Sequence, residues 1–86
     1  MEIVFAPEAK IDLQYWRSDI AMQKRITAIL KDISVSPFRG IGKPEPLKYN
    51  LTGKWSRRLD RKNRIIYSVE VNAIVVYSLR GHYLDN

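Results

Sequence analysis

Residues 42–67 read GKPEPLKYNLTGKWSRRLDRKNRIIY, and the chain changes from one kind of pattern to another within this stretch. Its first part contains Gly42, Pro44 and Pro46, which disfavour regular structure, whereas apolar and polar residues alternate from Lys54 onward. Turn residues followed by alternation are typical of a loop that leads into β-strands. The stretch therefore predicts that the second half of the chain forms a sheet.

We expect three strands after this loop, at residues 54–60, 64–70 and 73–80, and a short apolar edge near residues 47–51. If both connecting loops hold an odd number of residues, opposed positions share the same parity, and one face of the sheet packs against helices. The odd-numbered set expected on that face is Trp55, Leu59, Ile65, Tyr67, Val69, Val75, Tyr77 and Leu79.

The other face of the sheet would stay open. It would carry both arginine and apolar side chains, which predicts a lined groove and not a purely polar one. Arg57 has the opposite parity, and we expect its long side chain to reach water at an edge of the sheet. The even-numbered set expected on the open face is Arg58, Arg64, Arg80, Ile66, Ile74 and Val76.

The first half of the chain predicts one strand and two helices. Residues 2–6 are mostly apolar and include the β-branched Ile3 and Val4, and Pro7 both ends this strand and suits the first position of a helix that ends near Ser18. Asp19 is a good N-cap for the second helix. Its apolar stripe comprises Met22, Ile26, Ile29, Leu30 and Ile33, and its solvated face comprises Gln23, Lys24, Arg25, Lys31 and Asp32.

These elements predict an α+β fold in which two helices pack on one face of a small, mainly antiparallel, twisted sheet, in the order β-α-α-β-β-β-β. The 86 residues include no cysteine and no linker, so we expect a single domain over residues 1–86. No apolar run has transmembrane length, which favours a cytoplasmic protein with no membrane contact.

The formal net charge of +6 favours an anionic partner, with nucleic acid first and an acidic protein second. Gly40-Ile41-Gly42-Lys43 is not a nucleotide-binding loop, because Pro37 occupies the place of its first glycine and Pro44 that of its hydroxyl residue. The charge alone does not decide between these two partners.

Three side chains could supply the chemistry of RNA cleavage. Glu45 lies between two prolines, which keep it extended, and could take the proton of a ribose 2′-hydroxyl. Arg64 could stabilise the charge of the phosphorane, and His82, the only histidine, could protonate the leaving 5′-oxygen. This set needs no metal or cofactor. Taken singly, a loop carboxylate and a terminal histidine are more often only solvated.

Several motifs resemble one family. Gly42-Lys43-Pro44-Glu45-Pro46-Leu47-Lys48, Asn50-Leu51-x-Gly53-x-Trp55-Ser56-Arg57-Arg58, Arg64-Ile65-Ile66-Tyr67 and His82-Tyr83 are similar to the YoeB/Txe type of toxin in the RelE superfamily. The resemblance covers nearly the whole chain in unbroken order. It implies a RelE-like fold and a toxin of a type II toxin–antitoxin pair that cuts messenger RNA in the ribosomal A site.

The resemblance also implies roles and partners. Glu45 would be the general base, His82 the general acid, Arg64 the stabiliser of the transition state and Tyr83 an orienting ring. The substrate would further be held by Lys48 and Arg58, with Lys43, Arg57 and Arg80 in the same basic surface. The expected partners are messenger RNA on the ribosome, a YefM/Axe-type antitoxin and a second copy of the chain.

Two other functions are consistent with the residues. A non-catalytic basic module would only bind RNA or an acidic protein. A gyrase-inhibiting relative of the same fold should lack the combination of Glu45, Arg64 and His82. The presence of these three side chains favours the ribonuclease.

Overall fold

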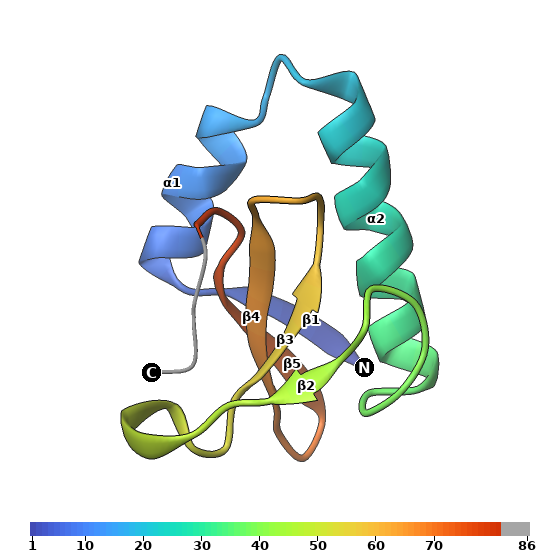
Figure 1. Cartoon of the computed structure of the whole chain (residues 1–86), viewed down its shortest axis with the longest axis vertical. Helices are drawn as coiled ribbons and strands as arrows, with labels where there is room; N and C mark the ends of the chain where they lie inside the picture. Colours follow the sequence, from blue (N-terminus) through green and yellow to red (C-terminus); the bar gives the residue numbers. More distant parts are fainter. Residues whose placement is uncertain (82–86) are drawn as a thin grey trace.

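The computed structural model describes residues 1–81, so His82 and Tyr83 lie outside the described residues (Figure 1). No helix in that part of the chain is long and apolar enough to cross a membrane. The elements are β1 (Glu2–Phe5), α1 (Pro7–Tyr15), α2 (Ile20–Val35), β2 (Glu45–Pro46), the 3₁₀ helix η1 (Tyr49–Leu51), β3 (Trp55–Arg58), β4 (Arg64–Val69) and β5 (Ala73–Ser78).

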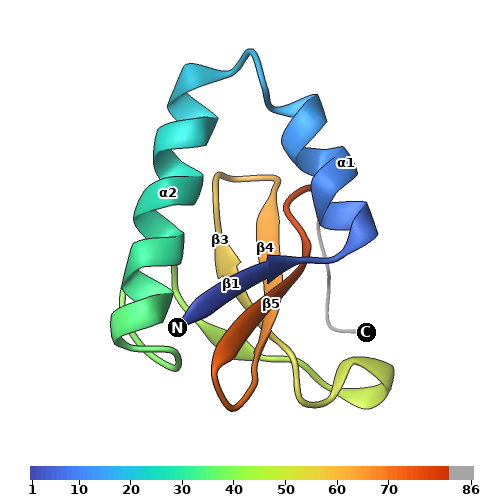
Figure 2. The same cartoon turned by 180° about the vertical axis from the view of Figure 1, so that it is seen from behind.

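The five strands form one sheet in the order β1-β5-β4-β3-β2. Only β1 and β5 run parallel, and every other neighbouring pair is antiparallel. In Figures 1 and 2 the helices diverge from their connection, with the turn between β3 and β4 between them. The predicted α+β fold with two helices and a mainly antiparallel sheet is confirmed.

Helix α1 is short and is fastened to the end of β5. It begins at Pro7, as predicted, and ends at Tyr15, slightly earlier than predicted. The buried carboxylate of Asp12 accepts a hydrogen bond from the Leu79 amide (2.8 Å), and Trp16 Nε1 donates to the Leu79 carbonyl (2.9 Å). Both backbone groups of Leu79 are thereby satisfied, and the residue that follows β5 is fixed against α1.

Helix α2 provides the apolar cover of the sheet. Asp19 is its N-cap, and the side chain accepts a hydrogen bond from the Met22 amide at 2.9 Å. The predicted stripe is buried, apart from Leu30, which is half-buried at the edge of the core. The core cluster comprises Ala9, Met22, Ile26, Ile29, Ile33, Leu59, Ile65, Tyr67, Ile74, Val76 and Leu79.

The parity prediction holds for β3 and β4 and is wrong for most of β5. Arg58 lies opposite Arg64, so parity is kept across that loop. The next turn closes with a Glu70 to Ala73 hydrogen bond and places Val69 opposite Ile74, which reverses the parity. The predicted faces are therefore exchanged: Ile74 and Val76 lie in the core, whereas Val75 and Tyr77 lie on the open face.

A register shift between Ile66 and Tyr67 then restores the original parity. Ile66 lies opposite Ser78, so that Leu79 returns to the core as predicted. A bulge of this kind depends on the partner strand and cannot be read from the alternation of one strand alone.

Candidate functional site

Glu45 and Arg64 meet on the face of the sheet opposite the helix-packed core. Glu45 lies in β2 directly opposite Ser56 of β3, and its carboxylate is 3.1 Å from the Arg64 guanidinium. The Arg64 side chain is 11% exposed and that of Glu45 is 52% exposed. Arg64 Nε also donates to Ser56 Oγ at 2.9 Å. The Glu45 carboxylate is therefore accessible to solvent, while the Arg64 side chain is largely buried and is fixed by Ser56.

A second arginine faces Arg64 across the strands. Arg58 lies directly opposite it and is exposed. Like charges at opposed positions destabilise a sheet, so this pair is typical of a site that binds an anion. Burial lowers the pKa of Arg64, the nearby Glu45 raises it and Arg58 lowers it further. A phosphate between the two guanidinium groups would relieve their repulsion.

The backbone on both sides of Glu45 is strained. Lys43 has a φ of 52° and Tyr49 a φ of 58°, in the left-handed region that residues with a side chain rarely adopt. Lys43 also precedes a proline, which normally favours extended backbone. Its carbonyl accepts a hydrogen bond from Arg64 at 3.4 Å. Strain that surrounding contacts maintain is frequent at functional sites. Lys48, the remaining predicted cation of this segment, is exposed.

The last described residue is tied to the same site. The carbonyl of Gly81 accepts a hydrogen bond from the Arg64 amide (3.0 Å), and the Gly81 amide donates to Asn63 Oδ1 (2.9 Å). Gly81 has a φ of 101°, which favours glycine. The residue that immediately precedes His82 in sequence is thus bonded to the backbone of Arg64.

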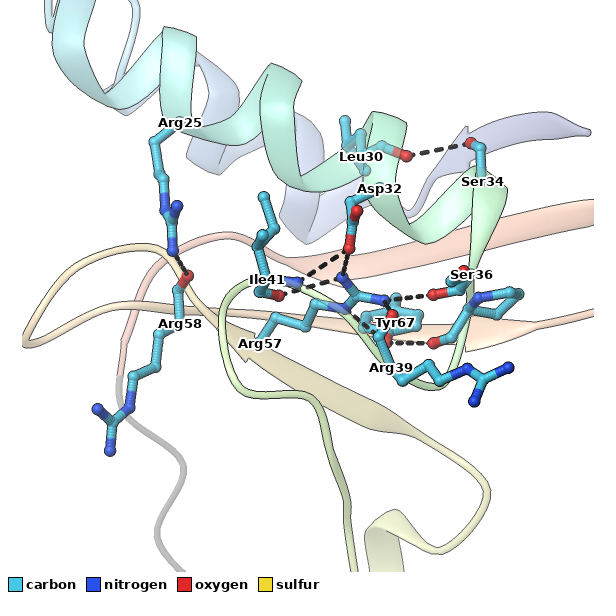
Figure 3. A network of polar contacts seen from close by, with 11 residues as sticks. Arg25, Leu30, Asp32, Ser34, Ser36, Arg39, Ile41, Arg57, Arg58 and Tyr67 are labelled. Carbon is cyan, nitrogen blue, oxygen red and sulfur yellow. Dashed lines mark hydrogen bonds and ion pairs between the residues drawn. The ribbon is translucent and has the colours of Figure 1, made fainter.

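Arg57 is not at an edge, and the prediction that it reaches water there is wrong. Its side chain is fully buried. In Figure 3 its guanidinium points into the loop after α2, whereas Arg58 points away from that loop. Nη1 contacts Asp32 at 2.5 Å, and Nε donates a hydrogen bond to the Tyr67 hydroxyl at 3.2 Å. Because it is fully buried, Arg57 cannot contact a substrate as the sequence had predicted.

The same guanidinium organises the loop that leads to Glu45. It donates to the carbonyls of Ser36 (2.6 Å), Arg39 (3.1 Å) and Ile41 (3.1 Å). Figure 3 shows these bonds converging on one side chain. A Cβ atom at Gly40 would overlap the Asp32 carboxylate, so this position requires glycine. Arg57 is a structural residue that holds the loop against α2 and the sheet.

Asp32 was expected on the solvated face of α2; its side chain is 31% exposed, but it is bonded to the loop and to β3. Its carboxylate binds Arg57 and accepts a hydrogen bond from the Ile41 amide at 3.0 Å. The hydrogen bond from Arg57, followed by that from Ile41, holds the pKa of Asp32 below its ordinary value. Burial raises the pKa of Tyr67, whose hydroxyl donates to the Pro37 carbonyl at 2.7 Å and remains neutral.

Arg80 is exposed, as predicted, and its contact is with α1. Its guanidinium lies 3.6 Å from the centroid of the Tyr15 ring. This cation–π contact is with α1, which packs against β5, whereas Arg64 lies on β4. The three arginines predicted on one face therefore do not form a single cluster. Arg58 and Arg64 are opposed across the strands, and Arg80 stacks separately on Tyr15.

Three polar residues of the site were not predicted from the sequence: Ser56, Asn63 and Asp12. The first two support Arg64 and Gly81, and Asp12 holds Leu79. The only sequence signal for Ser56 was its even parity beside Arg58 and Arg64. Asp12 carried no such signal, because the residue that it binds is distant in sequence.

The fold is that of a class of small bacterial toxins. The chain superposes on the solved YoeB/ParE toxin from Agrobacterium tumefaciens with a TM-score of 0.93 and 35% identity, covering 96% of this chain and 100% of that chain. The YoeB dimer from Staphylococcus aureus gives a TM-score of 0.90 and 42% identity, with 96% and 98% covered. The YoeB-YefM complex from the same organism gives 0.89 and 41%, with the same coverage.

Sequence comparison narrows this class to one family. Residues 5–83 match the YoeB-like toxins of bacterial type II toxin–antitoxin systems. Toxin YoeB of Escherichia coli is 40% identical over 84 residues, and Toxin YoeB of Streptomyces coelicolor is 42% identical over 84 residues; each alignment covers 96% of this chain and 100% of the relative. The chain belongs to the YoeB-like toxin family, and the resemblance found in its motifs is confirmed.

Proposed function

We propose that this toxin is a ribonuclease that cuts messenger RNA by general acid–base catalysis without a metal. The observation that carries the proposal is the contact between Glu45 and Arg64 on the uncovered face of the sheet, with Arg58 opposed to Arg64. A carboxylate beside two arginines combines a proton acceptor with a site for a phosphodiester. Membership of a toxin family agrees with an activity that harms the cell that contains it.

In the proposed reaction Glu45 accepts the proton of the 2′-hydroxyl, and the 2′-oxygen attacks the adjacent phosphorus atom. Arg64 and Arg58 stabilise the negative charge of the phosphorane. The bond to the 5′-oxygen breaks, and that oxygen takes a proton from His82. The products are a 2′,3′-cyclic phosphate, or the phosphate that its hydrolysis yields, and a 5′-hydroxyl end.

The Glu45–Arg64 ion pair suits such a cycle. When RNA binds, its phosphate can take the place of the carboxylate at the Arg64 guanidinium, since phosphate accepts the same charge-assisted hydrogen bonds. The carboxylate is then free to bind the 2′-hydroxyl. His82 is assigned as the acid because it follows Gly81, which is bonded to Arg64, and because the family resemblance gives it this role. Tyr83 orients the substrate and Lys48, Lys43 and Arg80 attract it.

We further propose that cleavage takes place in the ribosomal A site and that a YefM-type antitoxin blocks the toxin. A domain of 86 residues has little surface with which to select and orient a single strand, so a substrate already positioned by the ribosome would lower the entropic cost. The YoeB of S. aureus was solved in complex with YefM and as a dimer. The same partner and a homodimer are proposed for this chain.

The test is a cleavage assay on messenger RNA bound to programmed ribosomes and on the same RNA free in solution, with the new 5′ ends mapped. Glu45→Gln and His82→Gln should each lower the rate by about 10² to 10⁴ and leave the melting temperature unchanged. Glu2→Gln, an exposed acid on the opposite edge strand, is the matched control and should cut as the wild type does.

Each alternative function predicts a different result. Absence of RNA cleavage by the wild type and by both variants would support the non-catalytic binding module. Broken DNA without RNA cleavage would support the gyrase-inhibiting relative. Cleavage of free RNA at the rate seen on ribosomes would contradict ribosome dependence and leave the ribonuclease assignment standing.

A further inference from the structure

A hollow of about 300 Å³ lies on the same uncovered face of the sheet as Glu45 and Arg64. Its size is at the lower end of the range of small-ligand sites. Ile66 is almost fully buried and forms part of its floor. The hollow is lined by residues 6–8, Leu51, Lys54, Ile66, Tyr77 and Ser78.

The hollow is adjacent to the proposed catalytic pair. Ile66 follows Arg64 by two residues on β4, so the two side chains are on the same face and about 7 Å apart along the strand. Ser56 connects them, because it lies opposite Ile66 and accepts the hydrogen bond from Arg64 Nε. A single strand that placed a phosphate at Arg64 would therefore bring a neighbouring nucleotide to the hollow.

The walls combine an aromatic ring with a cation. Lys54 Nζ lies 4.2 Å from the centroid of the half-buried Tyr77 ring. The Tyr77 hydroxyl is hydrogen-bonded to Ser68 Oγ at 2.9 Å, so the orientation of the ring is set from its far end. Sites that bind single-stranded nucleic acid commonly combine aromatic rings that stack on bases with cations that attract the phosphate backbone.

We propose that this hollow is a nucleobase subsite of the ribonuclease, an inference that rests on the proposed function. The base of a nucleotide next to the scissile phosphate enters the hollow against Tyr77 and Leu51. Lys54 exchanges its partly exposed contact with the ring for that nucleotide's phosphate, since a charge-assisted bond to phosphate is stronger than an exposed cation–π contact.

A base fits the lining better than a phosphate does. Leu51 and Ile66 offer no donor to an anion, and the exposed carboxylate of Glu8 at the rim would repel one. That carboxylate can instead accept a hydrogen bond from an exocyclic amino group. We therefore expect the hollow to prefer adenine, cytosine or guanine, which carry such a group, over uracil.

The test is a scan of a short, 2′-fluoro-substituted single strand in which one base at a time is replaced by an abasic site. Affinity is measured by fluorescence anisotropy for the whole toxin at low ionic strength. For the wild type, one abasic position should weaken binding about fivefold to 100-fold. For Tyr77→Leu, binding of the intact strand should be weakened by a similar factor, and the abasic site at that position should cost nothing more.

Two controls separate this role from general effects. Tyr77→Phe keeps the ring and should retain the positional effect. Lys54→Gln should weaken binding more than Lys24→Gln, which removes the same charge from the exposed face of α2. Melting temperatures of all variants establish that they are folded.

The subsite is overturned if no abasic position is special for the wild type, or if Tyr77→Leu leaves the positional loss intact. It is also overturned if Tyr77→Leu weakens binding of an antitoxin peptide and leaves RNA binding unchanged, because the hollow would then serve a protein partner. If Tyr77→Leu cleaves RNA and binds it with unchanged affinity, the subsite proposal is wrong and the ribonuclease assignment stands. If the wild type does not cleave RNA, the proposed function itself is wrong.

Discussion

Arg57 and Arg58 are adjacent in β3 and have opposite roles, because successive side chains of a strand point to opposite faces. Arg57 is buried with five hydrogen bonds, and Arg58 is exposed opposite Arg64. A buried guanidinium is tolerated only if it is paired and its donors are satisfied. Here Asp32 and the loop carbonyls meet that requirement.

Replacement of Arg57 by methionine should therefore be far more harmful than the same replacement at Arg58. Arg57→Met leaves the carbonyls of the loop without their donor and should lower the free energy of unfolding by about 3 to 5 kcal/mol. Arg58→Met, the matched control, should change it by about 0.5 kcal/mol or less. Urea denaturation followed by circular dichroism measures both values, and similar losses for the two variants would contradict this account.

The carboxylate of Asp32 should make stability depend on pH at the acid end. Its pKa is lower in the folded protein than the value of about 3.9 of an unfolded chain. The stabilisation is thus complete above about pH 4 and is lost as the pH falls through the folded-state pKa. Wild type should lose stability over that interval more steeply than Asp32→Asn, as measured by thermal melts from pH 6 to pH 2. Parallel curves would contradict the role of this group.

The segment between α2 and β3 is ordered by contacts at each of its ends. Arg57 and Asp32 hold its beginning, the Arg58 amide donates to the Gly42 carbonyl (2.6 Å), and Leu47 donates to the Lys54 carbonyl (2.9 Å). Glu45 lies between these attachments. Its position is consequently set by the loop as a whole, and the strained backbone of Lys43 is part of that arrangement.

Glycine at position 43 should relieve this strain. Lys43→Gly and Lys43→Ala both remove the cation, so both should lower RNA affinity by a similar factor. Only the glycine variant accepts the φ of 52° without penalty, so it should be more stable than the alanine variant by about 1 kcal/mol. Differential scanning calorimetry of the pair, together with RNA binding by each, checks the prediction. Equal stability of the two variants would show that the backbone there is not strained.

The elements were largely predictable, and their side-chain placement less so. Pro7 and Asp19 start their helices as local rules require, and the stripe of α2 is buried. The extended backbone at Glu45 follows from its flanking prolines. The exchange of faces along β5 could not be predicted, because it results from a two-residue turn and a bulge whose positions depend on pairing with β4.

The excess of cations over the whole molecule should govern its affinity for RNA. With a net charge of +6, binding should weaken steeply as salt rises, since bound phosphates release their counterions. The opposed arginines lie on the open face of the sheet and the exposed Lys48 follows β2 in sequence, whereas other cations, such as Lys24, lie on α2. Only cations that contact phosphate contribute to the salt dependence.

Lys48→Ala should therefore reduce the slope of log K against log salt by about 0.7, the contribution of one phosphate contact to a single strand. Lys24→Ala, which removes the same charge from the outer side of α2, should leave the slope unchanged. Titrations of a single strand at several salt concentrations measure both slopes. An equal change in the two variants would mean that net charge, and not a defined face, controls binding.

Local chemistry in the sequence determined the strand and helix order, the caps, the extended acid between two prolines and the basic character of the surface. Tertiary structure alone decided that Arg57 is buried and supports the loop, that Ile74 and Val76 enter the core, and that Gly81 is bonded to Arg64. The physical reason is that backbone propensity acts within a few residues, whereas burial, strand register and the partner of a charge depend on segments distant in the chain.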